Sequence, residues 1–409
     1  MYDNEGGRHY WFAEELIKRG YKVTIFCSNQ YHFKDKEMPL DTKLYTKKIK
    51  NNIQFVFIKS VSSKGNGYKR VLNMTSFYTN LRKVCKTYIS DFDYPDVIIG
   101  SSVHPLAMLA GVKIGKQLNV PAISEIRDLW PEAIFAFNKS KENSLLGKLL
   151  INGEKWIYEH SHALVFTKEG DVDYIKERRW NTSNGGKIDL GNCYYINNGI
   201  SLKSFRNQIE DNVLEDPDLS NDSTFKVIYA GSLRPVNDVQ KIIQAAKLLK
   251  KNHNIQFLIF GQGIEESNLK SLIKENNLDN VKMKGYVDKK FIPYILSRSN
   301  VNILNYSQSK YNWSRGNSSN KLFEYMASGK PIISTVKMGY CLITRYNCGL
   351  VAENDGPEAL AASIKELFDL DNKSYDKMQK NSLAAADDFD FSVLTSKLEI
   401  VIANVLSKN

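Results

Sequence analysis

The stretch G-N-S-S-N-K-L-F-E-Y-M-A-S-G-K-P, residues 316 to 331, decides how the rest of this sequence is interpreted. Its two serines and Asn320 are good helix N-cap residues, and its closing glycine, lysine and proline form a stop signal. Leucine, tyrosine and methionine make an apolar stripe, while Asn320, Lys321 and Glu324 fall on the opposite side at 100° per residue. The stretch therefore predicts a short amphipathic helix entered from a polar loop.

The polar side of this helix has the chemistry of a ligand site. A helix N-terminus offers unpaired backbone N–H groups and partial positive charge, which suit a phosphate. Glu324, one turn further in, is placed to accept hydrogen bonds from a vicinal diol. Together these features outline a site for a nucleotide sugar. The alternative is an ordinary amphipathic helix with a solvated Glu324 and Lys321, and the helix alone favours neither.

Length and composition indicate a soluble globular protein with two domains. The 409 residues are 42% hydrophobic and 25% charged, and such a length holds two cores of ordinary size. No run of eighteen apolar residues exists, and the polar N-terminus is not a signal sequence, so neither a membrane span nor export is indicated. The five cysteines show no C-x-x-C spacing and predict free thiols in a reducing cytosol. The histidines form no metal-binding pattern.

The net charge of +11 is concentrated in one segment. Residues 34–86 hold thirteen Lys and Arg against three Asp and Glu, which gives 13 − 3 = +10. Aromatic rings are interleaved with these charges, as in a surface that meets anionic lipid headgroups. Nucleic acid is the competing partner for such a segment, and plain solubilising charge is the third interpretation. We expect the membrane partner, at the inner face of the plasma membrane, and no nucleic acid.

Helical and strand patterns alternate along the whole chain, which predicts an α/β fold with parallel sheets. A change to Asn, Gly, Ser and Asp over residues 180–223 marks a domain boundary. We therefore expect two doubly wound, Rossmann-like lobes, residues 1–203 and 204–389. A final helix within residues 390–409 is compatible with either lobe. Expected strands include residues 23–27, 55–58, 97–100 and 122–124 in the first lobe and residues 226–230, 256–260 and 301–304 in the second.

The loops that leave the strands of the second lobe carry the remaining candidate donor-site residues. Ligands of doubly wound sheets bind beyond the carboxyl ends of the strands. Glycines there let a backbone approach a phosphate, an arginine grips one bidentately, and an aromatic ring holds a base. The candidate residues in these loops are Gly231, Ser232, Arg234, Gly261, Gly263 and Tyr286, followed by Ser319, Asn320, Lys321 and Glu324. A lone G-x-G such as Gly261 to Gly263 serves equally as a tight turn.

Several segments of both predicted lobes resemble those of a known family. Y-A-G-S-L-R, F-G-Q-G, K-G-Y-V and N-K-L-F-E-Y-M-A-S-G-K-P resemble the second domain of the retaining glycosyltransferases of family four, which have the GT-B fold. G-G-R-H-Y-W-F-A-E-E-L, S-S-V-H-P-L and E-I-R-D-L-W-P-E in the first lobe resemble those members that build bacterial capsules, O-antigens and colanic-acid-like polymers, including fucosamine transferases.

The resemblance implies a sugar nucleotide on the second lobe, an acceptor on the first, and a cleft between them. It implies that Glu324 binds the ribose hydroxyls and that Ser319 and Asn320 bind the diphosphate. The chain departs from the pattern in two places. Gly316 stands where the family has the first of two glutamates, and Ser232 and Asn237 stand where it has a basic pair. Arg234 and Lys321 are then left to neutralise phosphate, and we expect no cofactor and no metal.

The first lobe should carry the acceptor-side groups. Glu125, Arg127 and Asp128 leave a strand, so that a carboxylate there orients or deprotonates the acceptor hydroxyl and Arg127 balances the diphosphate. Asp128 has the alternative role of capping the following turn, and His104 is as compatible with buried structure as with the site. Gly6, Gly7 and Arg8 form the glycine-rich acceptor and phosphate loop that the family places after the first strand.

No strand precedes that loop in the sequence, so the first strand of the N-terminal lobe is expected to be missing. We expect the upstream reading frame to encode an apolar strand.

The function expected from this resemblance is transfer of a hexose or N-acetylated amino sugar from a UDP-type donor to a lipid-linked saccharide in bacterial surface polysaccharide synthesis. A non-catalytic GT-B scaffold at the membrane is the alternative, favoured by Gly316 and by the missing strand. A nucleotide-sugar epimerase is the second alternative.

Overall fold

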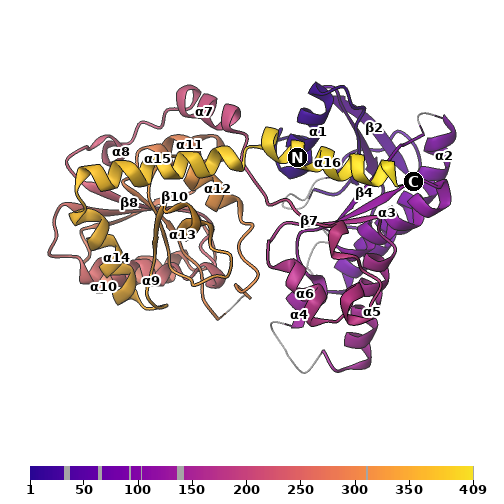
Figure 1. The fold of residues 1–409 in the computed structure, drawn as a ribbon. Helices are drawn as coiled ribbons and strands as arrows, with labels where there is room; N and C mark the ends of the chain where they lie inside the picture. The colour runs from indigo at the N-terminus through magenta and orange to yellow at the C-terminus, as the bar shows by residue number, and fades with distance from the viewer. Residues whose placement is uncertain are drawn as a thin grey trace. The chain divides into compact units, whose positions relative to one another are not determined.

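The chain divides into two compact units, which we treat as two lobes (Figure 1). The computed structural model describes residues 1–31, 37–62, 67–91, 94–102, 104–135, 142–309 and 312–408. The first lobe comprises residues 1–197 and 394–409, and the second comprises residues 198–393. The division thus lies six residues before the predicted one. Most of the final helix, α16 (Phe391–Ser407), belongs to the first lobe.

The second lobe contains one continuous six-stranded parallel sheet in the order β10-β9-β8-β11-β12-β13. Its strands are β8 (Phe225–Ala230), β9 (Ile255–Phe260), β10 (Val281–Gly285), β11 (Val301–Leu304), β12 (Ile332–Ser334) and β13 (Gly349–Val351). The central strands are runs of β-branched and aromatic residues that are buried on both faces, as helices on both sides of a parallel sheet require.

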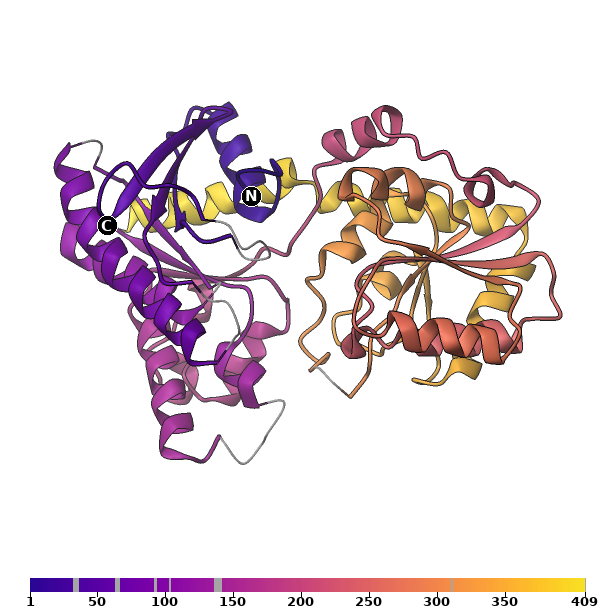
Figure 2. The ribbon, with the colours of Figure 1, turned by 180° about the vertical axis from the view of Figure 1, so that it is seen from behind.

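Helices cover both faces of this sheet (Figures 1 and 2). On one face lie α9 (Val239–Leu248), α10 (Glu266–Glu275) and α14 (Pro357–Asp369), and on the other lie α11 (Ile292–Ser297), α12 (Asn320–Ala327) and α15 (Asn372–Asp388). The lobe also contains α7 (Leu202–Asp211), α8 (Pro217–Ser220) and α13 (Leu342–Tyr346). The helix predicted from residues 316–331 is α12, and its apolar stripe is buried. Helix α15, which packs against α12, was not predicted because its polar sequence lacks a strong apolar stripe.

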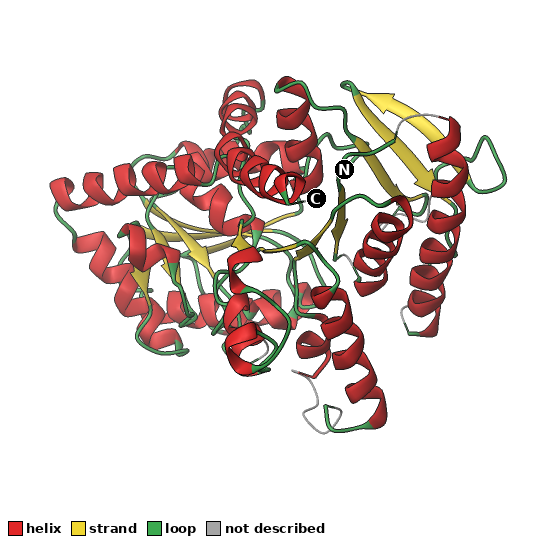
Figure 3. Ribbon diagram, turned by 45° about the vertical axis from the view of Figure 1, so that its right-hand side comes forward, coloured by secondary structure: helices red, strands yellow, loops and turns green. Residues whose placement is uncertain are grey.

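The strands of the first lobe fall into two groups, coloured yellow in Figure 3. One group has the order β1-β3-β2 and the other has the order β4-β5-β6-β7. The strands are β1 (Thr24–Ser28), β2 (Tyr45–Lys50), β3 (Ile53–Ile58), β4 (Ile98–Ser101), β5 (Ala122–Ile126), β6 (Ala163–Phe166) and β7 (Cys193–Tyr195). The helices are α1 (Arg8–Lys18), α2 (Tyr68–Asp91), α3 (Pro105–Leu118), α4 (Trp130–Phe135), α5 (Leu145–Glu159) and α6 (Asp171–Glu177).

One strand pair corrects the prediction of purely parallel sheets. Strand β2 pairs with β3 in the antiparallel direction, whereas the sequence prediction had no strand at residues 45–50. Asn51 and Asn52 join the two strands with φ angles of 48° and 62°. Two asparagines with positive φ suit the two-residue turn that matches the twist of a hairpin. The pair of asparagines between two alternating segments was the signal that could have revealed it.

The two strand groups of the first lobe are not joined by backbone pairing among the described residues. Strands β1 and β4 each pair on one side only, with β3 and β5 respectively. One hydrophobic cluster, beneath α2 and α3, includes Phe26 of β1 and Ile98 of β4. On β4 the side chain of Ile99 is 38% exposed, which is unusual for a strand of a doubly wound lobe.

None of the described helices is long and apolar enough to cross a bilayer.

Candidate functional site

The predicted donor-site loops of the second lobe meet at one edge of its sheet. Gly231 follows β8, Gly261 follows β9 and Gly285 ends β10, and because these strands are parallel their carboxyl ends share that edge. Backbone hydrogen bonds join the loops. The amide of Gly231 donates to the carbonyl of Phe260 over 2.9 Å, and the amide of Gly261 donates to the carbonyl of Gly285 over 2.7 Å. The loops therefore form one connected floor.

Two glycines in this floor, Gly261 and Gly263, are required because backbone approaches them closely. Gly261 has a φ of 142°, and a Cβ there would lie 1.8 Å from the carbonyl oxygen of Gly231. A Cβ on Gly231 itself would lie 2.5 Å from Nζ of Lys321. A Cβ on Gly263 would lie 2.1 Å from the backbone carbonyl oxygen of Leu233. The G-x-G pattern thus has a packing role in addition to any role with a ligand.

Lys321 places a positive charge directly over this floor. Its Nζ donates to the hydroxyl of Tyr229 over 3.1 Å and lies 4.6 Å and 5.1 Å from the ring centroids of Tyr229 and Tyr306. Within the described part of the chain it forms no ion pair. Burial lowers the pKa of Lys321 to about 8, although the charge of Glu324 opposes the shift. A buried ammonium held by two rings and no carboxylate is suited to an anionic ligand.

The start of α12 adds an unused hydroxyl beside this lysine. Ser319 is the N-cap, but its side chain accepts no capping hydrogen bond. Its Oγ is buried and lacks a hydrogen-bond partner, while its amide donates to the side chain of Asn317 over 2.7 Å. Asn320, the first helical residue, is exposed. Buried polar atoms are nearly always paired, so a lone hydroxyl at a helix start is consistent with a place for a ligand oxygen.

Glu324 lies one turn into α12 with 17% of its side chain exposed. Its carboxylate is 3.6 Å from Nζ of Lys289, a side chain that is 76% exposed. Burial raises the pKa of Glu324, and the charges of Lys289 and Lys321 partly offset that rise. The carboxylate therefore has only one loose partner and keeps acceptor capacity for hydroxyl groups.

The other predicted donor-site residues lie at the same edge with different surroundings. Arg234 is exposed, and the side chain of Tyr286 is 62% exposed, with its hydroxyl donating to Asp288 over 3.3 Å. Ser232 and Asn237, which stand where the family has a basic pair, are hydrogen-bonded to each other. The side-chain amide of Asn237 donates to Ser232 Oγ over 2.8 Å. These two polar residues thus brace the loop after β8, and their roles toward a ligand stay predictions.

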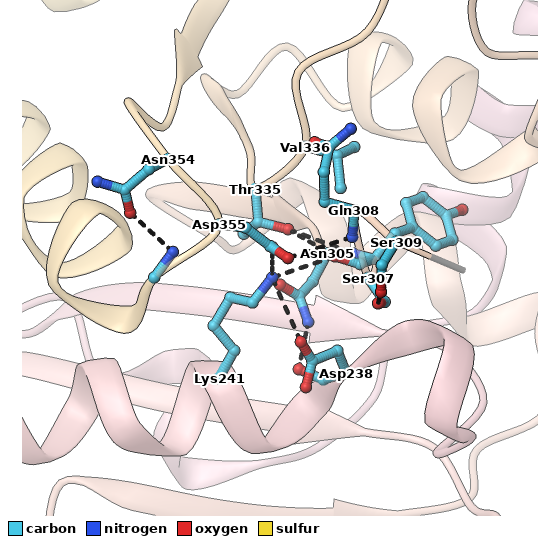
Figure 4. Close-up of polar contacts among 12 residues, drawn as sticks. Asp238, Lys241, Asn305, Ser307, Gln308, Ser309, Thr335, Val336, Asn354 and Asp355 are labelled. Carbon is cyan, nitrogen blue, oxygen red and sulfur yellow. Dashed lines mark hydrogen bonds and ion pairs between the residues drawn. The ribbon is translucent and has the colours of Figure 1, made fainter. Parts of the chain in front are cut away.

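A second polar cluster at this edge was not predicted from the sequence. In Figure 4, Lys241 of α9 points between Asp238 and Asp355. Its Nζ lies 3.3 Å from the Asp238 carboxylate, pairs with Asp355 and donates to the carbonyl of Tyr306 over 3.2 Å. The side chain of Asn305 donates to the carbonyl of Asp238 over 2.7 Å. This cluster ties the loops after β8, β11 and β13 together, and Lys241, unlike Lys321, is already neutralised.

In the first lobe, the predicted residue Glu125 is the centre of a buried network. It stands near the end of β5 and is 4% exposed. Its carboxylate accepts from Arg8 Nε over 2.7 Å, from His9 Nε2 over 2.9 Å and from Ser101 Oγ over 2.6 Å. Burial alone would raise the pKa of Glu125, but the charge of Arg8, with His9 and Ser101, outweighs it and holds that pKa well below its usual range.

Arg8, which the sequence places in an acceptor and phosphate loop, has several protein partners, and its role toward a ligand stays a prediction. It is 6% exposed, and besides Glu125 it donates to the backbone carbonyls of Ile196 and Asn197 after β7. Gly7, with a φ of 101°, is the N-cap that turns the chain into α1, and Gly6 lies just before it. His9 was missed by sequence reasoning. Its position next to Arg8 gave no signal, because its partner Glu125 is 116 residues away.

The remaining predicted residues of the first lobe lie around β4 and β5 with separate partners. His104 is the N-cap of α3, 9% exposed, with its ring 5.8 Å from that of Phe77, and burial, helped by Arg70, lowers the pKa of His104 to about 4. Asp128 is paired with Lys168 over 3.3 Å. The backbone amide of Arg127 donates to Ser102 Oγ over 2.8 Å. Their catalytic roles stay predictions.

Comparison with known families covers nearly the whole chain. Residues 10–202 match the model described as Glycosyltransferase Family 4, and residues 213–384 match the model described as Glycosyl transferases group 1. The chain is made of two glycosyltransferase domains. Its parallel α/β lobes have the GT-B fold.

Solved structures share this fold at low sequence identity. Trehalose 6-phosphate synthase from Burkholderia multivorans superposes with a TM-score of 0.71 and 10% identity, over 99% of this chain and 93% of that one. HepE from Anabaena, solved in complex with UDP, gives a TM-score of 0.60 and 14% identity, over 83% of this chain and 90% of that one. A further complex of HepE contains UDP-glucose.

A curated relative matches part of this chain. It is TuaH of Bacillus subtilis (strain 168), named for teichuronic acid biosynthesis, with 30% identity over 165 residues. The match covers 39% of this chain and 39% of TuaH, so the chain spans about two fifths of the length of that relative.

Proposed function

We propose that this glycosyltransferase moves a hexose or an N-acetylated amino sugar from a UDP-sugar to a lipid-linked saccharide in bacterial surface polysaccharide synthesis. Retention of the anomeric configuration is part of the proposal and rests on the family resemblance. HepE, with its bound UDP and UDP-glucose, supports the donor class, and TuaH, named for teichuronic acid biosynthesis, supports the class of pathway.

The observation that carries the donor proposal is Lys321. Its half-buried side chain places the ammonium over the Gly231 loop with no carboxylate partner in the described residues, and the unpaired hydroxyl of Ser319 lies at the start of the same helix. A diphosphate at this helix start would give the ammonium a counterion and the hydroxyl a partner. Glu324, one turn further along α12, would then accept hydrogen bonds from the ribose hydroxyls.

The proposed chemistry follows from this placement. A glycosyl donor reacts when its nucleotide diphosphate departs, so a site that stabilises the departing negative charge lowers the barrier. Lys321 and the start of α12 supply that stabilisation, with Arg234 near the same edge. No metal is part of the proposal, and we expect EDTA to leave the rate of transfer unchanged. A loss of activity that added Mg²⁺ or Mn²⁺ restores would contradict this.

Exposed apolar side chains on the first lobe support the proposed membrane partner. On α2 they are Tyr68, Val71 and Leu72, which lie in the basic segment 34–86, and on α5 they are Leu145, Leu146 and Leu149. Residues 34–36 and 63–66 of that segment lie outside the described residues. Apolar side chains flanked by basic ones suit an anionic bilayer surface. We therefore place the lipid-linked acceptor with the first lobe.

The test is thermal stabilisation by UDP and by GDP. Ligand at one hundred times its dissociation constant stabilises by about 2.7 kcal/mol, which is roughly 5 to 10 °C for a unit of this size. We expect UDP to stabilise the wild type, Glu324→Ala to weaken the response, and Lys321→Met to remove it. Lys289→Met is the matched control, because among the described residues that exposed lysine forms an ion pair with Glu324 alone. Absence of any response to either nucleotide would overturn the proposal.

A further inference from the structure

Two tyrosine side chains hold the ammonium of Lys321 over the floor of the second lobe. Its Nζ donates to the hydroxyl of Tyr229 over 3.1 Å and lies 4.6 Å and 5.1 Å from the ring centroids of Tyr229 and Tyr306. An aromatic face attracts an ammonium that lies within about 6 Å of its centroid. Tyr229 belongs to β8, Tyr306 follows β11 and Lys321 lies in the first turn of α12. Three elements of the lobe therefore meet at this one charge.

The hydroxyl of Tyr229 is itself oriented toward the lysine. It donates to the backbone carbonyl of Ser232 over 3.0 Å, so its lone pairs remain to accept from Nζ of Lys321. The same carbonyl accepts from the side chain of Asn237 over 2.6 Å and does not depend on Tyr229 for a partner. Tyr229 is 1% exposed, and burial raises its pKa well above the usual range, so the hydroxyl stays protonated and neutral.

The second polar cluster fixes the other ring. The backbone carbonyl of Tyr306 accepts from Nζ of Lys241 over 3.2 Å and from the hydroxyl of Thr335 over 3.3 Å. The amide of Tyr306 donates to that hydroxyl over 3.2 Å. The ring of Trp313 packs against the ring of Tyr306 with 4.9 Å between the centroids. The cluster of Figure 4 thus acts, through the backbone of Tyr306, on the ring that faces Lys321.

An ammonium held by tyrosines differs from one held by carboxylates. Lys241 pairs with Asp238 and Asp355, which neutralise its charge. The tyrosines fix the position of Lys321 but, within the described part of the chain, leave its charge without an ion-pair partner. Gly231 provides the space, because a Cβ there would lie 2.5 Å from Nζ of Lys321. An anion that reaches this floor meets a cation already in place, so less side-chain entropy is lost on binding.

We propose that Tyr229 and Tyr306 are positioning residues that hold the Lys321 ammonium where the diphosphate of the donor binds. This inference rests on the proposed function and deepens it. The tyrosines act through the lysine, and no proton is transferred by either of them. The departing diphosphate then meets a positive charge whose position is fixed before the reaction, which is the arrangement that stabilises a developing negative charge most effectively.

The first measurement is the affinity of Tyr229→Phe for UDP by isothermal titration calorimetry. The change keeps the ring and removes the hydroxyl that accepts from Lys321. We expect the dissociation constant to rise about tenfold, the effect of losing one hydrogen bond to a charged group. Tyr325→Phe is the matched control. Its hydroxyl bonds the backbone of Ala230 on the same strand, over 3.4 Å and 3.5 Å, so UDP affinity should stay within about twofold of the wild type.

An equal loss of affinity in Tyr325→Phe would assign the effect to packing of α12 on β8 and overturn the proposal.

The second measurement separates the phosphates from the rest of the nucleotide. Uridine carries the base and the ribose of UDP without the diphosphate. Tyr229→Phe should therefore leave the affinity for uridine, followed by ligand-observed NMR, within about twofold of the wild type. A loss for uridine as large as the loss for UDP would overturn the proposal, because a displaced ammonium loses no charge partner on uridine.

The third measurement tests the second ring. Tyr306→Leu removes a cation–π contact and keeps the backbone bonds to Lys241 and Thr335. We expect the dissociation constant of UDP to rise about threefold, less than in Tyr229→Phe, because such a contact is weaker than a hydrogen bond to a charged group. Wild-type affinity in Tyr306→Leu would overturn the role of Tyr306.

This inference and the proposed function fail in different ways. Tyr229→Phe that binds UDP as tightly as the wild type would overturn the inference and leave the proposed function intact. A wild-type protein that does not bind UDP would overturn the proposed function, and this inference with it.

Discussion

Both lobes alternate strands and helices, but among the described residues only the second lobe has one continuous sheet. In the second lobe six parallel strands form one sheet, and the central strand β11 is buried along its whole length. In the first lobe the described strands form two groups, every residue of β1 is half-buried, and Ile99 of β4 is 38% exposed. A continuous sheet brings its carboxyl-edge loops together through backbone bonds. In the first lobe a buried charge network centred on Arg8 and Glu125 joins α1 to the edge of the β4-β5-β6-β7 group.

The largest expected effect is on that charge network. Glu125→Ala leaves the Arg8 guanidinium buried without its carboxylate, and removing one partner of a buried pair typically costs 3–5 kcal/mol. We expect urea denaturation to show a loss of about this size. Glu324→Ala is the matched change in the second lobe, and without nucleotide it should cost less than about 1 kcal/mol, because its partner Lys289 is exposed. Equal losses would show that the lobes do not differ in this way.

The next effect tests the backbone floor of the second lobe. Gly261→Ala combines a φ of 142° with a Cβ that would lie 1.8 Å from a carbonyl oxygen, and we expect a loss of about 2–4 kcal/mol. Gly153→Ala is the control in the first lobe. That glycine lies inside α5 with nothing within 4 Å of its Cβ, so alanine should stabilise by about 0.5–1 kcal/mol. Thermal denaturation of both variants decides the matter, and a tolerated Gly261→Ala would contradict the close approach.

Hydrogen exchange compares the two sheets directly. Amides of β1 and β4 belong to strands that pair on one side only within the described residues, whereas β8 and β9 each have two neighbours. Opening free energies follow local packing, so we expect β1 and β4 to open at about 2 kcal/mol lower cost, roughly 30-fold faster exchange. Protection of β4 equal to that of β8 would indicate a sheet that is continuous in solution.

The smallest expected effect is a pH dependence that belongs to the first lobe. Glu154 of α5 is buried and accepts from the hydroxyls of Tyr158 and Tyr174, and burial raises its pKa to about 7. Because the folded-state pKa is raised, the contribution to stability is complete below the unfolded-state pKa of about 4.3 and is lost as pH rises through 7. Between pH 6 and 8 the wild type should lose about 1 kcal/mol relative to Glu154→Gln in urea denaturation.

A pH response that is the same in Glu154→Gln would assign the dependence to other groups. Lys321 in the second lobe should act in the opposite direction. Its folded-state pKa is lowered to about 8, so its contribution is present at high pH and is lost as pH falls through 8.

The sequence by itself determined the α/β alternation, the two lobes, and helix α12 with its buried stripe and its polar side. These features depend on local patterns: the period of apolar residues, caps, and stop signals, which operate within one or two turns or strands. It also placed the candidate donor residues at one edge, because parallel strands of a sheet share their carboxyl ends. The β2–β3 hairpin was within reach of the same reasoning through Asn51 and Asn52.

Only the tertiary structure decided which of these residues pair with each other. Arg8 and His9 meet Glu125 from more than one hundred positions away. Among the residues that the structure describes, Lys321 rather than Lys241 is left without a carboxylate. Such contacts depend on how strands and helices pack, which fixes distances of a few ångströms between side chains far apart in the chain. A sequence shows that a lysine or a glutamate lies near a sheet edge, but burial and the nearest opposite charge decide whether it binds a ligand or holds the fold.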